Sequence, residues 1–281
     1  MQQTLTEQTR FTRTFILEET GLACDLLATL SELSKSRIKD CMAKGGVWWS
    51  RPGRATTRLR RATAEVKAGE KLELNFDPAL LSINPPQPEL IHKARHYSVW
   101  NKPGGVLAQG TRFADHCCLP RLAQTILGAR SELHPVHRLD REARGIMLLA
   151  HDGRAAAKLG ELFRSGEVLK EYTAIVRGVP DWTEYDMNEA LDDKPCRSLF
   201  SVIRCDPASD MTMLSARIET GRKHQIRRHL AALKHHVVGD PRYGRGKGFE
   251  LQLLATSLAF TCPFSGRAQR WEVAPLPFPI S

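Results

Sequence analysis

The sequence predicts an α+β protein whose large C-terminal domain is built on a mixed, mostly antiparallel sheet. Several strand-like segments follow one another between residues 96 and 262, an order that is untypical of a βαβ repeat. Two short helical segments and a few strands come first, and a proline-rich stretch separates them from the rest. A length of 281 residues fits one large domain with a small appendage.

The proline-rich stretch runs from Asp77 to Arg95 and carries prolines at positions 78, 85, 86 and 88. Prolines at this density disfavour both helices and central strands. We therefore expect an extended linker, placed at residues 81–95. It would divide an N-terminal domain of residues 1–80 from a catalytic domain of residues 96–281.

In the N-terminal domain, residues 11–19 have the pattern of a strand and residues 21–32 that of a short helix. Ser34 is a suitable N-cap for a second helix that ends at Gly45. Within this helix Ile38, Cys41 and Met42 share one face, which leaves Lys35 and Lys39 pointing outward, with Arg37 as a further candidate. Strands are expected at 47–50 and at 65–76, where apolar residues alternate after a turn at Gly69.

The C-terminal domain has a clearer pattern. Asp152 is placed to cap a helix over residues 153–166, and a second helix is expected over 222–235, with Ile226, Leu230 and Leu233 inward. Apolar or alternating runs predict strands at 96–102, 145–150, 170–178, 211–219 and 250–262.

The formal net charge of +10 and a pI near 9.5 indicate a polyanionic partner, with plain solubility as the alternative explanation. The charge is concentrated in two segments. Residues 33–61 contain nine Lys or Arg and one acidic residue, Asp40. Residues 217–247 contain nine Lys or Arg and two acidic residues, Glu219 and Asp240. Such clusters favour contact with a phosphate backbone. No basic amphipathic helix with an apolar face stands out, so a membrane partner is not expected.

Other classes of protein are disfavoured by what the chain lacks. No apolar run approaches the roughly 20 residues that span a bilayer, and the first residues do not resemble a secretory signal. Seven cysteines without a C-x-x-C pair predict reduced thiols and no zinc site. We expect a soluble, cytoplasmic protein that binds no metal or organic cofactor.

Two segments could carry chemistry. In residues 137–141, His-Arg-Leu-Asp-Arg, Asp140 is flanked by arginines just before a buried strand, where a nearby guanidinium would keep a carboxylate ionised. A surface ion-pair cluster is the alternative. Residues 220–229 begin a helix after Gly221, which permits a tight turn. The downstream segment 239–248 is glycine-rich and basic, and we interpret it as a flexible loop that touches phosphate, or as a plain surface turn.

These segments give a specific resemblance. Residues 137–150 are similar to the HRLD signature of the RluA family of pseudouridine synthases. Three further motifs occur in the family's order: 101–110 (NKPGGVLAQG), 170–178 (KEYTAIVRG) and 220–244 (from TGRKHQIRR to GDPRYG). Residues 20–80 also resemble the S4 RNA-binding domain, although VWWSRPG stands where that domain usually has V-N-G. Trp48 and Trp49 could stack on bases, but one aromatic of such a pair is often in the core.

The resemblance implies roles for residues at matching positions. Asp140 corresponds to the catalytic aspartate, Arg227 to the arginine that pairs with it, Tyr172 to the tyrosine that stacks on the flipped uracil, and Arg138 to the arginine that replaces the extruded base. Isomerisation of uridine breaks a C–N bond and forms a C–C bond, so an oxygen nucleophile has to hold one fragment meanwhile. We expect further RNA contacts from Arg144, Lys102, Arg222, Lys223, Lys35 and Arg37.

Two departures from the family pattern affect the prediction. Ala143-Arg144 replaces the usual Thr-Ser, and Leu253-Leu254-Ala255 replaces the usual Leu-His-Ala.

The main hypothesis is a monomeric, cofactor-independent synthase that modifies uridines in ribosomal or transfer RNA. The alternative is a catalytically silent RNA-binding protein with the same fold. A Ser-His-Asp hydrolase is disfavoured because the chain has no G-x-S-x-G motif.

Overall fold

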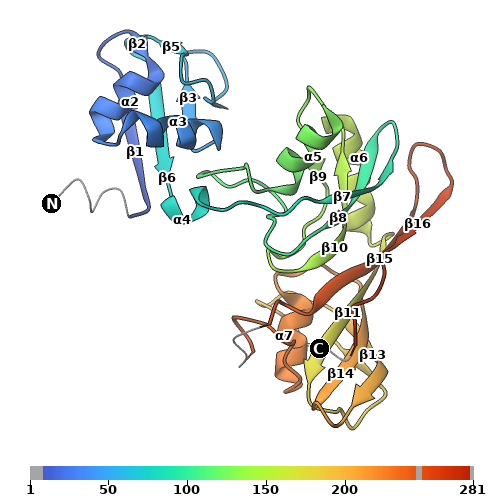
Figure 1. Ribbon diagram of the computed structural model, residues 1–281. Helices are drawn as coiled ribbons and strands as arrows, with labels where there is room; N and C mark the ends of the chain where they lie inside the picture. The colour runs from blue at the N-terminus through green and yellow to red at the C-terminus, as the bar shows by residue number, and fades with distance from the viewer. Residues whose placement is uncertain (1–8, 245–248, 279–281) are drawn as a thin grey trace. The chain divides into compact units, whose positions relative to one another are not determined.

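The computed structural model describes residues 9–244 and 249–278, which form two compact units (Figure 1). The small unit contains the chain up to residue 85 together with residues 109–122. The large unit contains residues 86–108 and the chain from residue 123 onward. The polypeptide therefore passes between the units three times, whereas the sequence predicted a single passage.

The small unit is a four-stranded antiparallel sheet with two main helices. The sheet has the order β1–β6–β3–β4, and a separate ladder joins β2 to β5. Its strands are β1 (Phe11–Ile16), β2 (Gly21–Leu22), β3 (Val47–Ser50), β4 (Thr57–Arg58), β5 (Glu65–Val66) and β6 (Lys71–Phe76). Its helices are α2 (Ala23–Ser31), α3 (Lys35–Ala43) and α4 (Pro78–Leu81), and α5 (Leu119–Leu127) begins in this unit.

The second helix, α3, confirms its predicted cap and buried face. The Ser34 hydroxyl accepts the Arg37 N–H at 3.5 Å, and Ile38, Cys41 and Met42 are fully buried against the sheet. Of the two adjacent tryptophans, Trp49 packs on this core and donates to Glu70. One member of the pair is thus partly buried against the core.

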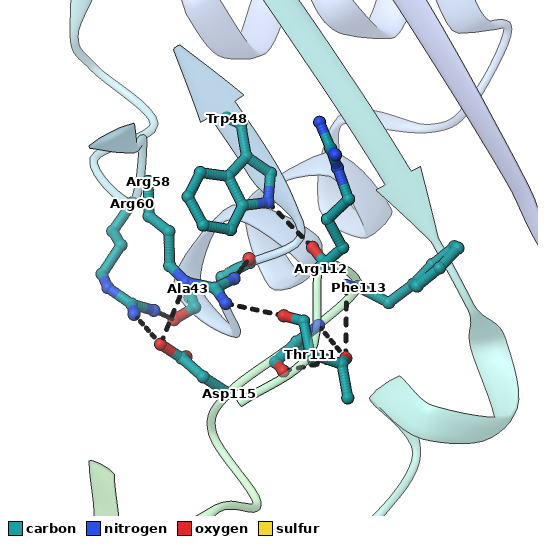
Figure 2. A network of polar contacts seen from close by, with 10 residues as sticks. Ala43, Trp48, Arg58, Arg60, Thr111, Arg112, Phe113 and Asp115 are labelled. Atoms are coloured by element: carbon teal, nitrogen blue, oxygen red, sulfur yellow. Dashed lines mark hydrogen bonds and ion pairs between the residues drawn. The ribbon is translucent and has the colours of Figure 1, made fainter. Parts of the chain in front are cut away.

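Residues 109–122 pack into the small unit although they follow the first strand of the large one. Ala114 is fully buried in the small unit's core. Asp115 forms ion pairs with Arg58 and Arg60, and the Trp48 indole donates to the Arg112 carbonyl at 2.9 Å (Figure 2). This segment supplies part of the core and the main carboxylate facing the unit's arginines.

The proline-rich stretch from Asp77 to Arg95 contains two short elements. Helix α4 starts with Pro78 in its first turn and is capped by Asp77, whose carboxylate accepts the Leu80 N–H. A proline in the first turn leaves no helix donor unpaired, so the expectation that prolines exclude a helix here was wrong. Residues 89–93 form β7 (Glu89–Lys93), which pairs only with β8 at the edge of the large sheet.

The large unit confirms the predicted α+β class with a mostly antiparallel sheet. Its strand order is β12–β13–β14–β11–β15–β10–β8–β7, with β16 beside β15 and β9 beside β10, and only the β10–β15 pair is parallel. The remaining strands are β8 (Tyr97–Lys102), β9 (His134–Pro135), β10 (Arg144–Ala150), β11 (Leu169–Arg177), β12 (Glu184–Met187), β13 (Ser198–Asp206), β14 (Met211–Ile218), β15 (Leu253–Thr261) and β16 (Ala268–Glu272).

Two helices of the large unit bear on the site. Helix α6 (Gly153–Ser165) is capped as predicted, because Asp152 accepts the Ala155 N–H at 2.8 Å. Helix α7 (Gln225–Ala232) is shorter than the predicted 222–235. His224 and Lys234 flank it in the left-handed conformation, with φ of 54° and 64°. The sharp turn was expected at Gly221, but the left-handed residue is His224.

All seven cysteines are free thiols in the structure. Within residues 9–244 and 249–278, no helix is both long and apolar enough to cross a lipid bilayer.

Candidate active site

The HRLD segment is held against the central sheet from two sides. Gly145, the second residue of β10, has φ of 115°, and a Cβ there would lie 2.2 Å from the Ala255 carbonyl oxygen of β15. This position therefore requires glycine. Upstream, Nε2 of His137 accepts the Leu148 N–H at 2.9 Å, and the imidazole stacks on Phe163. Burial lowers the pKa of His137 to about 3, so the imidazole is neutral and remains an acceptor.

Asp140 lies at the end of this segment and meets the guanidinium of Arg227 from α7. Nη1 of Arg227 donates to Oδ2 of Asp140 at 2.9 Å. The Arg227 side chain is 2% exposed, and that of Asp140 is 17% exposed. The arginines that flank Asp140 in the sequence were also expected to stabilise its charge, and the cation that pairs with it is Arg227, 87 residues later, as the family resemblance implied.

A second carboxylate completes this pairing. Asp240 is fully buried and accepts from Nε and Nη2 of Arg227 at 2.7 and 2.8 Å. It also accepts the backbone N–H groups of Arg242 and Tyr243. Such a two-point contact fixes the plane of a guanidinium. Arg227 therefore presents Nη1 to Asp140 in a set orientation.

Opposing effects act on the pKa values of this pair. Burial alone would lower the pKa of Arg227 and raise that of Asp240. The hydrogen bonds between Arg227 and Asp240 outweigh the effect of burial on both groups, and the bond from Arg227 to Asp140 adds to this for Arg227. The pKa of Arg227 is therefore raised and that of Asp240 is lowered. Both groups are charged at neutral pH.

His224 was not predicted as a site residue, yet it faces the same carboxylate. Its Nε2 lies 3.6 Å from Oδ1 of Asp140, and its Nδ1 lies 3.0 Å from the Tyr243 hydroxyl. Its left-handed backbone is a strained conformation for a residue with a side chain. Burial lowers the pKa of His224, and the nearby Arg227 adds to this, while Asp140 opposes it.

A cavity of about 190 Å³ opens beside Asp140. Tyr172 of β11 lines it and is 8% exposed. Burial raises the pKa of Tyr172, and the Asp140 charge adds to the effect, so the phenol is protonated at neutral pH. Arg138, Arg222 and Lys223 line the cavity. Ala143 and Leu253, which belong to the two departures from the family motifs, also line it. Asp140, Arg227, Tyr172, Arg138, Arg222 and Lys223 therefore share one site.

The other predicted contacts are not part of this cavity. Lys102 is fully buried, and its amine donates to the carbonyls of Pro103, Val106 and Arg141. Burial lowers the pKa of Lys102 to about 7, and the nearby Glu142 and Asp140 oppose this. The amine fixes the backbone around the HRLD segment, which does not fit the RNA contact predicted for it. Arg144 lines another hollow and donates to Gln252.

Lys35 and Arg37 lie on the small unit, on the outward side of α3. Lys35 pairs with Asp25 at 2.9 Å, and the Arg37 guanidinium lies over Phe76.

The predicted phosphate loop at 239–248 needs correction. Its described part is anchored, because Asp240 is buried in the ion pair with Arg227 and Tyr243 bonds to His224. Gly246 and Gly248, which were part of that prediction, lie outside the described residues. No cluster of three or more His, Cys, Asp or Glu that could hold a metal occurs among residues 9–244 and 249–278.

Known proteins share this fold and these motifs. A model of the family described as RNA pseudouridylate synthase matches residues 96–232. An uncharacterised RNA pseudouridine synthase from Chloroflexus aurantiacus is 30% identical over 281 residues, which cover 90% of this chain and 85% of the relative. The dual-specificity RNA pseudouridine synthase RluA of Vibrio parahaemolyticus is 31% identical over 214 residues, covering 66% of this chain and 84% of the relative.

A solved structure agrees with these matches. Human RNA pseudouridylate synthase domain containing 4 superimposes with a TM-score of 0.54 at 25% identity, covering 68% of this chain and 89% of that one. The chain is therefore a member of the RNA pseudouridine synthase family. Within that family it belongs with the RluA-type enzymes, as its four ordered motifs predicted.

Proposed function

We propose that Asp140 is the nucleophile with which this RNA pseudouridine synthase isomerises a uridine. The observation that carries the proposal is the buried Asp240–Arg227–Asp140 chain beside the cavity lined by Tyr172. The reaction breaks the bond between C1′ of the ribose and N1 of uracil, and it forms a bond from C1′ to C5. C5 then loses its proton and N1 takes up a proton, so the product has the same composition as uridine. A carboxylate that bonds one fragment in the interval keeps both fragments in place.

The ion-pair geometry suits a nucleophilic carboxylate. Asp240 neutralises much of the Arg227 charge and holds two of its donor nitrogens, so that a single Arg227 nitrogen contacts Asp140, through Oδ2. The other oxygen, Oδ1, lies 3.6 Å from His224 and can approach a substrate atom. Arg227 would thus orient Asp140 without occupying both of its oxygens.

Tyr172 and Arg138 serve substrate entry in this proposal. A uridine within folded RNA has to leave its stack, at a cost of a few kcal/mol. The Tyr172 ring offers a flat, buried face for the uracil while it turns. Arg138 at the wall would fill the gap left by the base. Arg222 and Lys223 would contact the neighbouring phosphates.

The target is ribosomal or transfer RNA. A relative from Zymomonas mobilis is called ribosomal large subunit pseudouridine synthase D; it is 26% identical over 276 residues, which cover 86% of each chain. A relative from Vibrio cholerae is called tRNA pseudouridine synthase C; it is 28% identical over 215 residues, which cover 63% of this chain and 86% of the relative. The small unit would act as an S4-like RNA-binding domain. We propose that the protein is cytoplasmic, where ribosomal and transfer RNA are found, and monomeric, as the family resemblance implies.

The test is pseudouridine mapping with Asp140→Asn. Ribosomal and transfer RNA from a deletion strain are incubated separately with the wild-type protein or the variant, and carbodiimide-dependent primer-extension stops are read. A new stop made by the wild type alone, with RNA affinity unchanged in the variant, supports the proposal. A stop made equally by Asp140→Asn would rule out this nucleophile. Tight binding with no stop from either protein would identify a silent RNA-binding protein instead.

A further inference from the structure

A second and larger cavity lies at the other end of α7. Its volume is about 780 Å³, and it is bordered by the end of β11 and by the chain that leaves α7. That chain is tied to the sheet, because Val237 bridges to Val176 and the Arg177 N–H donates to the His236 carbonyl. The hollow therefore has a rigid floor.

Its walls carry positive charge and hydrogen-bond donors. Arg177 and Lys234 border the cavity and are both exposed, and Asp210 also borders it. His235 and His236 add two imidazoles. Nδ1 of His236 is buried and has no hydrogen-bond partner among the described residues. A buried polar atom without a partner is destabilising, so a ligand that bonds to it would be favoured.

An aromatic surface completes the cavity. Phe249 borders it with 41% of its surface exposed, and the Arg177 guanidinium lies 6.0 Å from its ring centroid. An exposed ring beside cations is the combination that binds single-stranded nucleic acid, with a base on the ring and a phosphate on the cation. The alternative ligand, an apolar protein segment, is less well matched, because Phe249 is the one exposed aromatic ring among the described wall residues.

The position of the cavity relates it to the active site. Arg227 lies in the first turn of α7, and Lys234 follows the helix by two residues. Seven residues at 1.5 Å each place them about 10 Å apart along the helix axis. One RNA strand that places a uridine beside Asp140 can reach the second cavity with a nearby nucleotide.

We propose that this cavity binds a nucleotide of the substrate RNA that is not itself modified, with Phe249 under the base and Lys234 and Arg177 at the phosphate. The inference rests on the proposed function in that RNA is the ligand. It assigns to the cavity a share of RNA affinity and none of the chemistry, because Asp140, Arg227 and Tyr172 line the first cavity and not this one.

The test uses the full chain in three variants. Lys234→Asn removes the charge and tolerates the left-handed backbone, and Phe249→Ala removes the ring. Lys158→Ala, an exposed lysine on α6, is the matched control. Equal melting temperatures establish that all of them fold. The probes are total transfer RNA and total ribosomal RNA, and binding is measured at several salt concentrations.

Phe249→Ala should weaken RNA binding by roughly fivefold or more, because a stacked base is lost. Lys234→Asn should lower the slope of log affinity against log salt by about one, because one phosphate contact is lost. Both should raise KM and leave kcat unchanged. Ultraviolet cross-linking of the wild type should attach a nucleotide to the tryptic peptide of residues 248–267.

Two results would overturn the inference. One is that both variants bind RNA like Lys158→Ala while the wild type forms pseudouridine. The other is that uridine monophosphate or inorganic phosphate abolishes the cross-link without weakening RNA binding, which would make the cavity a site for a free phosphate compound. If no pseudouridine forms but the cross-link and the binding losses persist, the proposed function fails and the cavity assignment stands.

Discussion

The two basic segments of the chain use their arginines in different ways. In the small unit, Arg58 and Arg60 surround Asp115, and the side chains of all three are between 14% and 29% exposed. In the large unit, Arg227 is 2% exposed and lies between two carboxylates. Sequence analysis interpreted both segments in the same way, as a surface for phosphate.

This difference shows that a count of basic residues is a poor guide to nucleic-acid contact. Lys35 pairs with Asp25, Lys44 with Asp40, and Arg58 and Arg60 with Asp115. Four of the nine cations of segment 33–61 thus have carboxylate partners within the small unit. Burial decides what each pair does, because a water-exposed pair is weak and a buried pair fixes geometry.

The largest effect is expected from Asp240→Asn. It removes the charge that balances Arg227 in a fully buried position, and breaking a buried pair typically costs about 3–5 kcal/mol of stability. The freed guanidinium would also turn toward Asp140. We expect kcat to fall by roughly 100-fold or more, with RNA affinity retained.

The adjacent arginine provides the control. Arg228 makes the same two-point contact with Asp192, but Asp192 is 69% exposed. Asp192→Asn should leave kcat and melting temperature unchanged. Equal losses in the two variants, measured by single-turnover kinetics and thermal unfolding, would contradict the argument from burial.

An intermediate effect is expected on the pH dependence of stability. Burial lowers the pKa of His137 from its ordinary value near 6.5 to about 3. Below pH 6.5 the unfolded chain therefore binds a proton that the folded chain rejects. The free energy of unfolding should fall as pH drops from about 6.5 toward 3, by at most about 1.4 kcal/mol per pH unit from this group.

His137→Gln checks this assignment. Glutamine can accept the Leu148 N–H and does not titrate, so the variant should lose less stability than the wild type over the same pH range. Chemical denaturation at pH 7, 6 and 5 measures the difference. Parallel curves for the two proteins would show that another group causes the acid sensitivity.

The smallest effect is expected from Asp115→Ala in the small unit. It leaves two partly exposed guanidinium groups without their carboxylate, at a cost of about 1–3 kcal/mol. Thermal unfolding should show this loss, and the reaction of a short RNA at saturating concentration should keep its kcat. Asp186→Ala, which removes a half-exposed partner of Arg197, should show no measurable change. A large kcat loss in Asp115→Ala would mean that the small unit acts on the chemistry.

Much of the molecule followed from local sequence. Five strands of the large sheet (β8, β10, β11, β14 and β15), the caps Ser34 and Asp152, and the buried face of α3 were predicted because periodicity and capping depend on nearby residues, whereas β7, β9, β12, β13 and β16 were not predicted. The motif resemblance also picked out Asp140, Arg227 and Tyr172, and the structure brings them to one cavity. Their roles in catalysis stay predictions.

Tertiary structure alone decided the rest. Nothing near Asp240 or His224 in the sequence shows that one is buried on Arg227 and the other faces Asp140. Lys102 looked like a surface cation and is a buried donor to three carbonyls. Residues 109–122 belong to the small unit although they lie inside the other domain's sequence. Each outcome depends on which distant segment excludes water from a charged group, and that requires the folded chain.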